Sequence, residues 1–140
     1  YNKSMKKVNK NFYILLLIEA IVIAVFVRIY QFGMIPGGMN QDGAMAAVDA
    51  KALADYGTDR FGMRWPVHLT AWGFGQMSAL LSYLMIVPIK LFGLSVFSAR
   101  LPMLLVSLAS LVILYFFARD FAGKNTALAV LLFASISSKI

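Results

Sequence analysis

The chain has no cysteine and a single histidine, His68. Without cysteine it has no disulfide framework, no thiolate nucleophile and no Cys-ligated metal. One histidine excludes a metal site built from several histidines within these residues, and no Ser–Asp set lies near it in the sequence to form a catalytic triad. Tandem repeats, low-complexity tracts and heptads are also absent, which argues against a solenoid or a coiled coil.

Charged residues are scarce and apolar residues abundant. Charged side chains make up 14% of the 140 residues, hydrophobic side chains make up 61%, and the mean hydropathy is +0.78. This apolar content exceeds what a small soluble domain normally buries in its core. The composition therefore predicts an all-α membrane protein, a polytopic bundle whose first partner is the lipid bilayer.

Two apolar runs are long enough to cross a bilayer. A helix of about 20 apolar residues spans roughly 30 Å of hydrocarbon. The run 12–32 has only Glu19 and Arg28 as charges, and the run 101–118 has none. Charged groups within a span are costly, so Glu19, the deeper of the two, is expected to face other helices.

The run 76–93 is expected to form a further transmembrane span between these two, and the run 126–140 is expected to be the start of a fourth. The run 76–93 contains Pro88, which is expected to kink or shorten a helix, and Lys90. The last run is too short to cross the bilayer. Together with Tyr1 in place of an initiating methionine, it indicates the N-terminal part of a longer protein.

The net charge of +7 is concentrated before the first span. The segment 1–11 is basic, and no aromatic-basic motif for nucleic acid accompanies it. The positive-inside rule therefore places the N-terminus in the cytoplasm and the chain in the cell membrane. The apolar run is longer than the core of a signal peptide and lacks an A-x-A-like cleavage site, which favours a retained anchor. The lysines concerned are Lys3, Lys6, Lys7 and Lys10.

With this orientation and successive spans, the loop 33–75 is extracytoplasmic. The turn that contains Lys90 and Arg100 is then cytoplasmic, in agreement with the positive-inside rule. Arg119 and Lys124 would lie outside, against the same rule. The charge count thus supports the first loop better than it supports the later topology.

A helix is predicted at 42–56 within this loop. Asn40 or Asp42 suits its N-cap, and Gly57 suits the left-handed position after its end. An amphipathic helix lying on the membrane surface fits this pattern. Its apolar stripe is expected at Met45, Val48 and Ala52, with Asp49 and Asp55 on the other faces.

Asp42 is the main candidate for chemistry. A carboxylate at a membrane surface can act as a general base on an acceptor hydroxyl or amine, or can bind a divalent cation. Its plainer interpretation is a helix N-cap, and the two roles are compatible in one residue.

The order of motifs resembles the N-terminal part of the polytopic GT-C glycosyltransferases, more narrowly the bacterial relatives of protein O-mannosyltransferases and of the lipid A aminoarabinose transferase. The resemblance extends from about residue 12 onward, over only the N-terminal fraction of such an enzyme. The motifs are Pro-Gly-Gly-Met-Asn-Gln-Asp-Gly-Ala at 36–44, Asp-Tyr-Gly at 55–57, Trp-Pro at 65–66, Leu-Phe-Gly-Leu at 91–94 and Ser-Ala-Arg-Leu-Pro at 98–102.

The resemblance implies a sugar transferase that uses a polyprenyl-phosphate-linked donor and an extracytoplasmic acceptor. The enzyme would transfer a hexosyl or pentosyl group when full length, and this part alone is expected to be inactive. Asp42 falls on the first residue of the family's Asp-Glu motif, the proposed base or acceptor-site residue. Gly43 replaces the Glu, so no metal role is carried over and no cofactor is assigned.

Five further residues are candidates for contact with a phosphate or a sugar. For Arg100 the resemblance implies contact with a lipid phosphate or support of the fold, and its plainer interpretation is a cytoplasmic anchor. For the others the plainer interpretation is a solvated or interfacial side chain. The five are Arg60, Arg64, His68, Gln76 and Arg100.

Two other functions fit parts of the sequence. A transporter or channel subunit would use Glu19 and Arg28 to line a path, although no inverted repeat or pair of broken helices accompanies them. A small membrane scaffold protein is the other alternative.

Overall fold

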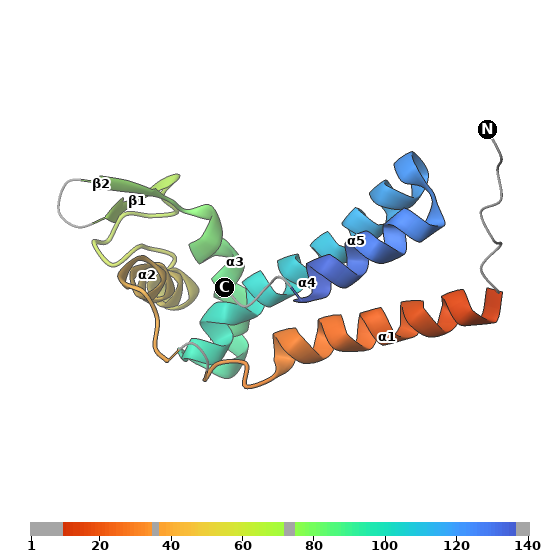
Figure 1. The fold of residues 1–140 in the computed structure, drawn as a ribbon. Coiled ribbons are helices and arrows are strands. Elements are labelled where there is room, and N and C mark those ends of the chain that lie inside the picture. The colour runs from red at the N-terminus through yellow and green to blue at the C-terminus, as the bar shows by residue number, and fades with distance from the viewer. Residues whose placement is uncertain (1–9, 35–36, 72–74, 137–140) are drawn as a thin grey trace. The chain divides into compact units, whose positions relative to one another are not determined.

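The computed structural model describes residues 10–34, 37–71 and 75–136, which divide into two compact units. The helical unit contains the residues up to Tyr30 and those from Ser107 onward, and the hairpin unit contains Gln31–Val106. The elements in chain order are α1 (Lys10–Ile29), α2 (Gln41–Tyr56), β1 (His68–Ala71), β2 (Gly75–Ser78), α3 (Leu80–Phe92), α4 (Val96–Ala122) and α5 (Lys124–Ile136) (Figure 1).

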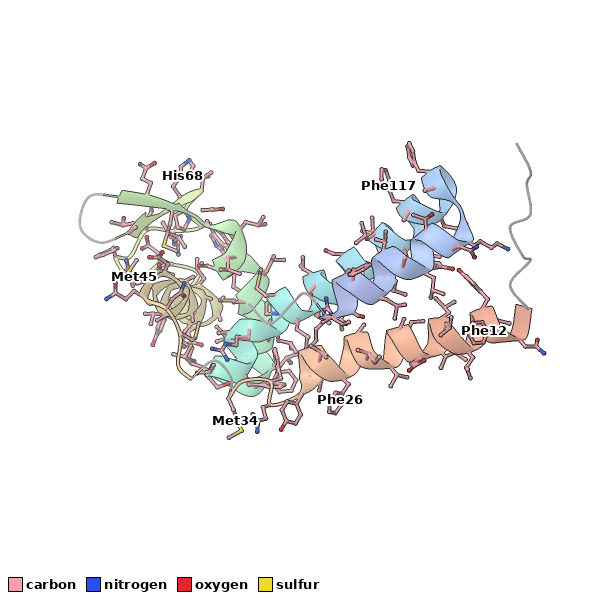
Figure 2. All side chains as sticks on the ribbon, viewed as in Figure 1. Phe12, Phe26, Met34, Met45, His68 and Phe117 are labelled. Atoms are coloured by element: carbon pink, nitrogen blue, oxygen red, sulfur yellow. The ribbon has the colours of Figure 1, made fainter. Side chains whose placement is uncertain are left out.

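Two helices are long and apolar enough to cross a membrane. They are Asn11–Ile29 of α1 and Val96–Ala122 of α4, close to the expected spans at 12–32 and 101–118. Their surfaces carry exposed side chains such as Phe12, Phe26 and Phe117 (Figure 2). The chain is thus mostly helical, and two of its helices could span a membrane by length and composition.

The expected span at 76–93 is wrong. Its first residues form β2, which pairs antiparallel with β1, so the chain is not all-α as predicted. The 13 residues of α3 extend about 20 Å at 1.5 Å per residue, less than the hydrocarbon thickness of roughly 30 Å. Its buried residues, Pro88 among them, pack inside the hairpin unit instead.

The ends of the chain agree with the expectation only in part. The predicted run 126–140 corresponds to α5, of which residues 137–140 lie outside the described part. Most of the basic segment 1–11 also lies outside it, because the described residues begin at the start of α1.

In the helical unit, α4 runs antiparallel to α1 and α5 runs parallel to it. At one end the Tyr13 hydroxyl lies 3.0 Å from the Tyr115 hydroxyl and donates to the Lys124 carbonyl at 3.2 Å. At the other end Arg28 donates to Ser107 of α4 and to Ala134 of α5. Between these ends, the small side chains of Ala20 and Ala24 pack against the larger Leu111, Leu128 and Leu131.

This direction of α4 corrects the predicted topology. The last turn of α4 and the first of α5 lie at the end of the unit where α1 begins, since Tyr13 contacts both Tyr115 and Lys124. Arg119 and Lys124 therefore lie at the end of the helical unit where α1 begins, whereas the prediction put them at the opposite end.

In the hairpin unit, α2 packs closely on α3 through alanines. The buried cluster consists of Ala46, Ala47, Ala50, Met85, Ile89 and Ala99. Ser82 of α3 donates to the carbonyl of Ala46 at 2.9 Å, which a larger side chain on α2 would obstruct. The predicted stripe is wrong by part of a turn, because Val48 is 46% exposed whereas Asp49 is buried.

The hairpin places one face toward this core. Leu69 pairs with Met77, and both are on the inner side, Leu69 buried and Met77 packed against the alanine cluster. Because side chains alternate along a strand, the register puts His68, Thr70, Gln76 and Ser78 together on the other face.

Candidate functional site

The N-terminus of α2 is capped by Asn40, not by Asp42. The Asn40 Oδ1 accepts from the backbone N–H of Gly43 at 2.9 Å, and Gly57 ends the helix with φ of 67° as predicted. Asp42 is the second residue of the helix and is exposed. The helix dipole favours a carboxylate in this first turn, and the carboxylate of Asp42 does not cap the helix. Asn40 thus has the capping role, and Asp42 stays a candidate for chemistry.

Gly43 fits this cap closely. A Cβ at position 43 would lie 2.6 Å from Asn40 Oδ1 and 3.2 Å from the Met39 Cε. The first distance is below any contact that real side chains make, so a larger residue would move the Asn40 side chain and weaken the cap. A glutamate at this position would require the Asn40 side chain to shift from its present place.

Arg100 lies beside the glycine turn that leads into α2. A terminal nitrogen of its guanidinium donates to the carbonyl of Gly38, two residues before the cap. Phe97, one turn earlier in α4, packs its ring against Phe32, and Gly33 approaches its Cβ. The segment after α1 and the start of α4 are therefore neighbours. The interpretation of Arg100 as a cytoplasmic anchor stays a prediction.

Arg60 contacts neighbouring parts of the hairpin unit through its backbone and its guanidinium. Its backbone N–H donates to Asp49 Oδ1 at 3.1 Å, its Nε lies 3.8 Å from the same oxygen, and a terminal nitrogen donates to the Thr70 carbonyl. The guanidinium also lies 5.0 Å from the centroid of the Phe61 ring. These contacts tie the loop after α2 to the hairpin.

Arg64, His68 and Gln76 remain exposed. The backbone of Arg64 forms an isolated bridge with Thr58. His68 lies on the hairpin (Figure 2), and by the strand register Gln76 shares its outer face. The structure puts His68 and Gln76 on one face, and among the described residues no contact joins either of them to Asp42. They stay candidates for binding a polar ligand.

Asp49 is a buried carboxylate that the sequence interpretation missed. The sequence predicts it on a face other than the apolar stripe, whereas only 1% of it is exposed and its Oδ2 has no hydrogen-bond partner among the described residues. Burial raises the pKa of the Asp49 carboxyl above its ordinary value, and the N–H and charge of Arg60 oppose that rise. Asp49 follows Asp42 by seven residues, about two turns on the same helix face, but Asp42 is exposed, so this spacing alone does not predict the burial of Asp49.

Two polar groups thus lie along one face of α2. The first comprises Gly38, Asn40, Asp42 and Arg100 at the helix N-terminus, and the second comprises Asp49 and Arg60 about 10 Å further along the axis. No cluster of three or more potential metal ligands occurs among the described residues. The first group combines an accessible carboxylate with a nearby turn that an arginine stabilises.

Glu19 and Arg28 lie on opposite faces of α1. They are nine residues apart, which at about 100° per residue places them half a turn from each other. Arg28 faces α4 and α5 through its hydrogen bonds, and Glu19 is exposed. The two charges do not line a common path.

No protein-family model, curated protein sequence or solved structure matches the chain. The arrangement of its own residues therefore carries the functional argument.

Proposed function

We propose that this chain is the N-terminal part of an integral membrane glycosyltransferase of the GT-C type. The enzyme moves a hexosyl or pentosyl group from a polyprenyl-phosphate-linked donor to an acceptor outside the cytoplasm. The observation that carries the proposal is that Asn40 alone caps α2, which leaves the carboxylate of Asp42 exposed in the first turn. The motif order from Pro36 to Pro102 supports the same assignment.

The direction of the two long helices supports the proposed orientation. Arg119 and Lys124 share the end of the helical unit where α1 begins, and the lysines of the N-terminus precede that end. The positive-inside rule then makes this end cytoplasmic in a multi-pass protein of the cell membrane. Residues 31–95 connect the outer end of α1 to the outer end of α4, so the segment with Asp42 is extracytoplasmic.

Asp42 acts as the general base in the proposed reaction. It accepts the proton of the acceptor hydroxyl or amine as that atom attacks the anomeric carbon of the sugar. The bond between this carbon and the phosphate oxygen breaks, and the polyprenyl phosphate leaves with the electron pair. The guanidinium of Arg100, beside the turn at Gly38, offers positive charge for that phosphate.

With Gly43 after Asp42, the start of α2 has one carboxylate where an Asp-Glu pair would have two. Only one carboxylate stands at this position, so the proposal assigns no metal ligand here. Arg64, His68 and Gln76, exposed on the loop and hairpin, are the remaining candidates for contacts to the sugar or the acceptor.

The experiment is a transfer assay with the protein expressed from its whole reading frame in membranes. Radiolabelled polyprenyl-phosphate mannose, glucose and aminoarabinose serve as donors, and Asp42→Asn is compared with the wild type. The proposal expects donor-dependent transfer that Asp42→Asn lowers by about 100-fold or more, in the range of a lost general base. Equal transfer by both proteins contradicts the role of Asp42.

A further inference from the structure

Glu19 occupies the middle of the apolar helix α1 without a partner. It is exposed, and no hydrogen bond or ion pair joins its side chain to another described residue. A carboxylate at the centre of a membrane span is costly in hydrocarbon, and such groups almost always face protein or water. The described helices satisfy neither condition, because α4 and α5 contact α1 through the opposite face.

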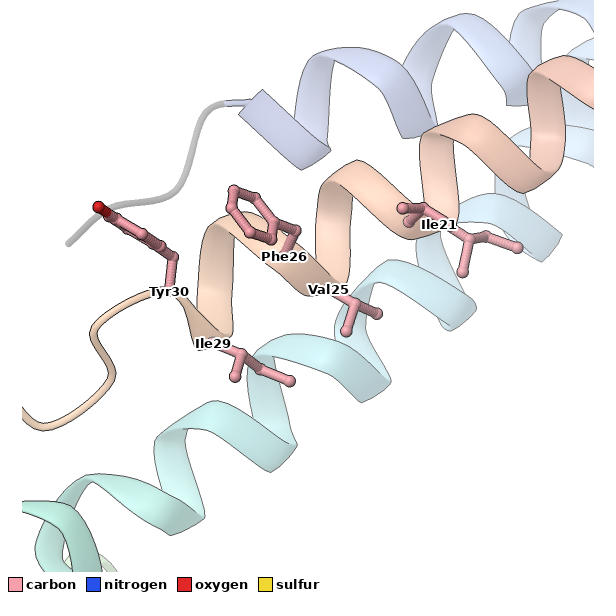
Figure 3. Close-up of a pocket in the computed structure, with 6 residues that line it drawn as sticks. Ile21, Val25, Phe26, Ile29 and Tyr30 are labelled. Carbon is pink, nitrogen blue, oxygen red and sulfur yellow. The ribbon is translucent and has the colours of Figure 1, made fainter.

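The face around Glu19 is suited to another helix. Leu15, Val22 and Phe26 lie one turn before, one turn after and two turns after it, and they are 61%, 59% and 62% exposed. An open, almost wholly apolar groove continues this face toward the C-terminal end of α1 (Figure 3). It is lined by Ile21, Val22, Val25, Phe26, Ile29 and Tyr30.

We propose that this face of α1 packs against a further transmembrane helix that carries an arginine or lysine at the depth of Glu19. Charge complementarity selects this occupant. A second copy of α1 placed symmetrically would bring two carboxylates together, and lipid offers no donor. Arg28 of the same chain cannot serve, because it faces the other way and donates to Ser107, Ala24 and Ala134. The inference requires that α1 crosses the bilayer and is independent of sugar transfer.

The test measures association in lipid vesicles between the labelled full chain and synthetic transmembrane peptides. One peptide has a leucine-alanine span with a single central arginine, and its matched control has leucine at that position. Energy transfer reports binding. The wild type is expected to bind the arginine peptide about tenfold or more tightly than the leucine peptide, which is the scale of a polar contact between membrane helices.

Two variants separate the carboxylate from the apolar face. Glu19→Gln keeps the shape, inserts at least as readily, and is expected to lose most of the preference for arginine. Ile18→Leu keeps the carboxylate and is expected to retain the preference. The proposal is overturned if the wild type binds both peptides equally, if Glu19→Gln keeps the preference, or if the labelled chains associate with one another through Glu19 without any preference for the arginine peptide.

Discussion

The Nε of Arg28 in α1 donates to the hydroxyl of Ser107 in α4 at 2.9 Å. The terminal nitrogens of the same guanidinium reach the carbonyls of Ala134 and Ser135 in α5, at 3.2 and 3.5 Å. One cation therefore joins three helices in an apolar setting, where an unsatisfied carbonyl is costly.

Arg28→Met is expected to destabilise the helical unit by about 2 to 3 kcal/mol, because it removes bonds to a charged donor and leaves carbonyls unpaired. Ser107→Ala removes one acceptor and is expected to cost about 1 kcal/mol. Reversible unfolding in mixed micelles measures both changes. A double-mutant cycle should show that the effects are not additive. Independent, additive effects would contradict a shared contact.

The cap at α2 gives a second prediction. Gly43→Ala gains helix propensity of about 0.5 to 1 kcal/mol but displaces Asn40 Oδ1, which costs about 0.5 to 2 kcal/mol. In an Asn40→Ala background there is no cap to lose, so Gly43→Ala is expected to stabilise the protein there. Thermal unfolding of the four proteins measures the coupling. The same effect of Gly43→Ala in both backgrounds would show that the cap and the glycine are independent.

Burial of Asp49 predicts a pH dependence. Its pKa is raised in the folded protein by burial, above an unfolded value of about 3.9. The folded state then binds the proton more tightly, so the stability contribution is full below the unfolded pKa and is lost as the pH rises through the folded pKa. Melting curves between pH 4 and 8 should show that the stability of the wild type rises relative to that of Asp49→Asn as the pH falls. Asp55→Asn, at an exposed position paired with Lys51, is the control. A difference that is constant with pH would contradict the raised pKa.

The topology is testable with single cysteines, since the native chain has none. Val67→Cys and Leu94→Cys, at exposed positions on either side of α3, are expected to react with an impermeant maleimide from outside the cell. Lys124→Cys is expected to react only after permeabilisation. Labelling of Leu94→Cys from the cytoplasmic side would indicate that 76–93 spans the membrane, and it would contradict the arrangement described for α3.

Local features were predictable from the sequence, and features that depend on distant contacts were not. The bounds of α2 and its glycine C-cap follow from residues within the helix and next to it. The prediction of a transmembrane span at α3 failed because an apolar run has the same composition whether lipid or protein covers it. Here α2 covers α3 through Ala46 and Ala50. Likewise, the burial of Asp49 depends on Arg60, which folds back from the following loop.

The direction of α4 shows the same limit for the candidate site. The pairing of Tyr13 with Tyr115 and of Arg28 with Ser107 shows that α4 is antiparallel to α1, which the order of apolar runs did not predict. The place of Arg100 beside the turn before Asp42 depends on its contact with the distant Gly38. The role of Asp42 in catalysis stays a prediction from its motif, and the choice of Asn40 as the N-cap became clear only from the backbone geometry.

The most direct test of the glycosyltransferase proposal is single-turnover sugar transfer by the complete protein in membranes, with Asp42→Asn beside Asp55→Asn. Both variants lose one exposed carboxylate of α2, so a general effect of charge on folding or insertion would appear in both. The proposal predicts transfer at the wild-type rate for Asp55→Asn and a rate lower by about 100-fold or more for Asp42→Asn. Wild-type transfer by Asp42→Asn, or no transfer from any of the three lipid-linked donors by the wild type, would contradict it.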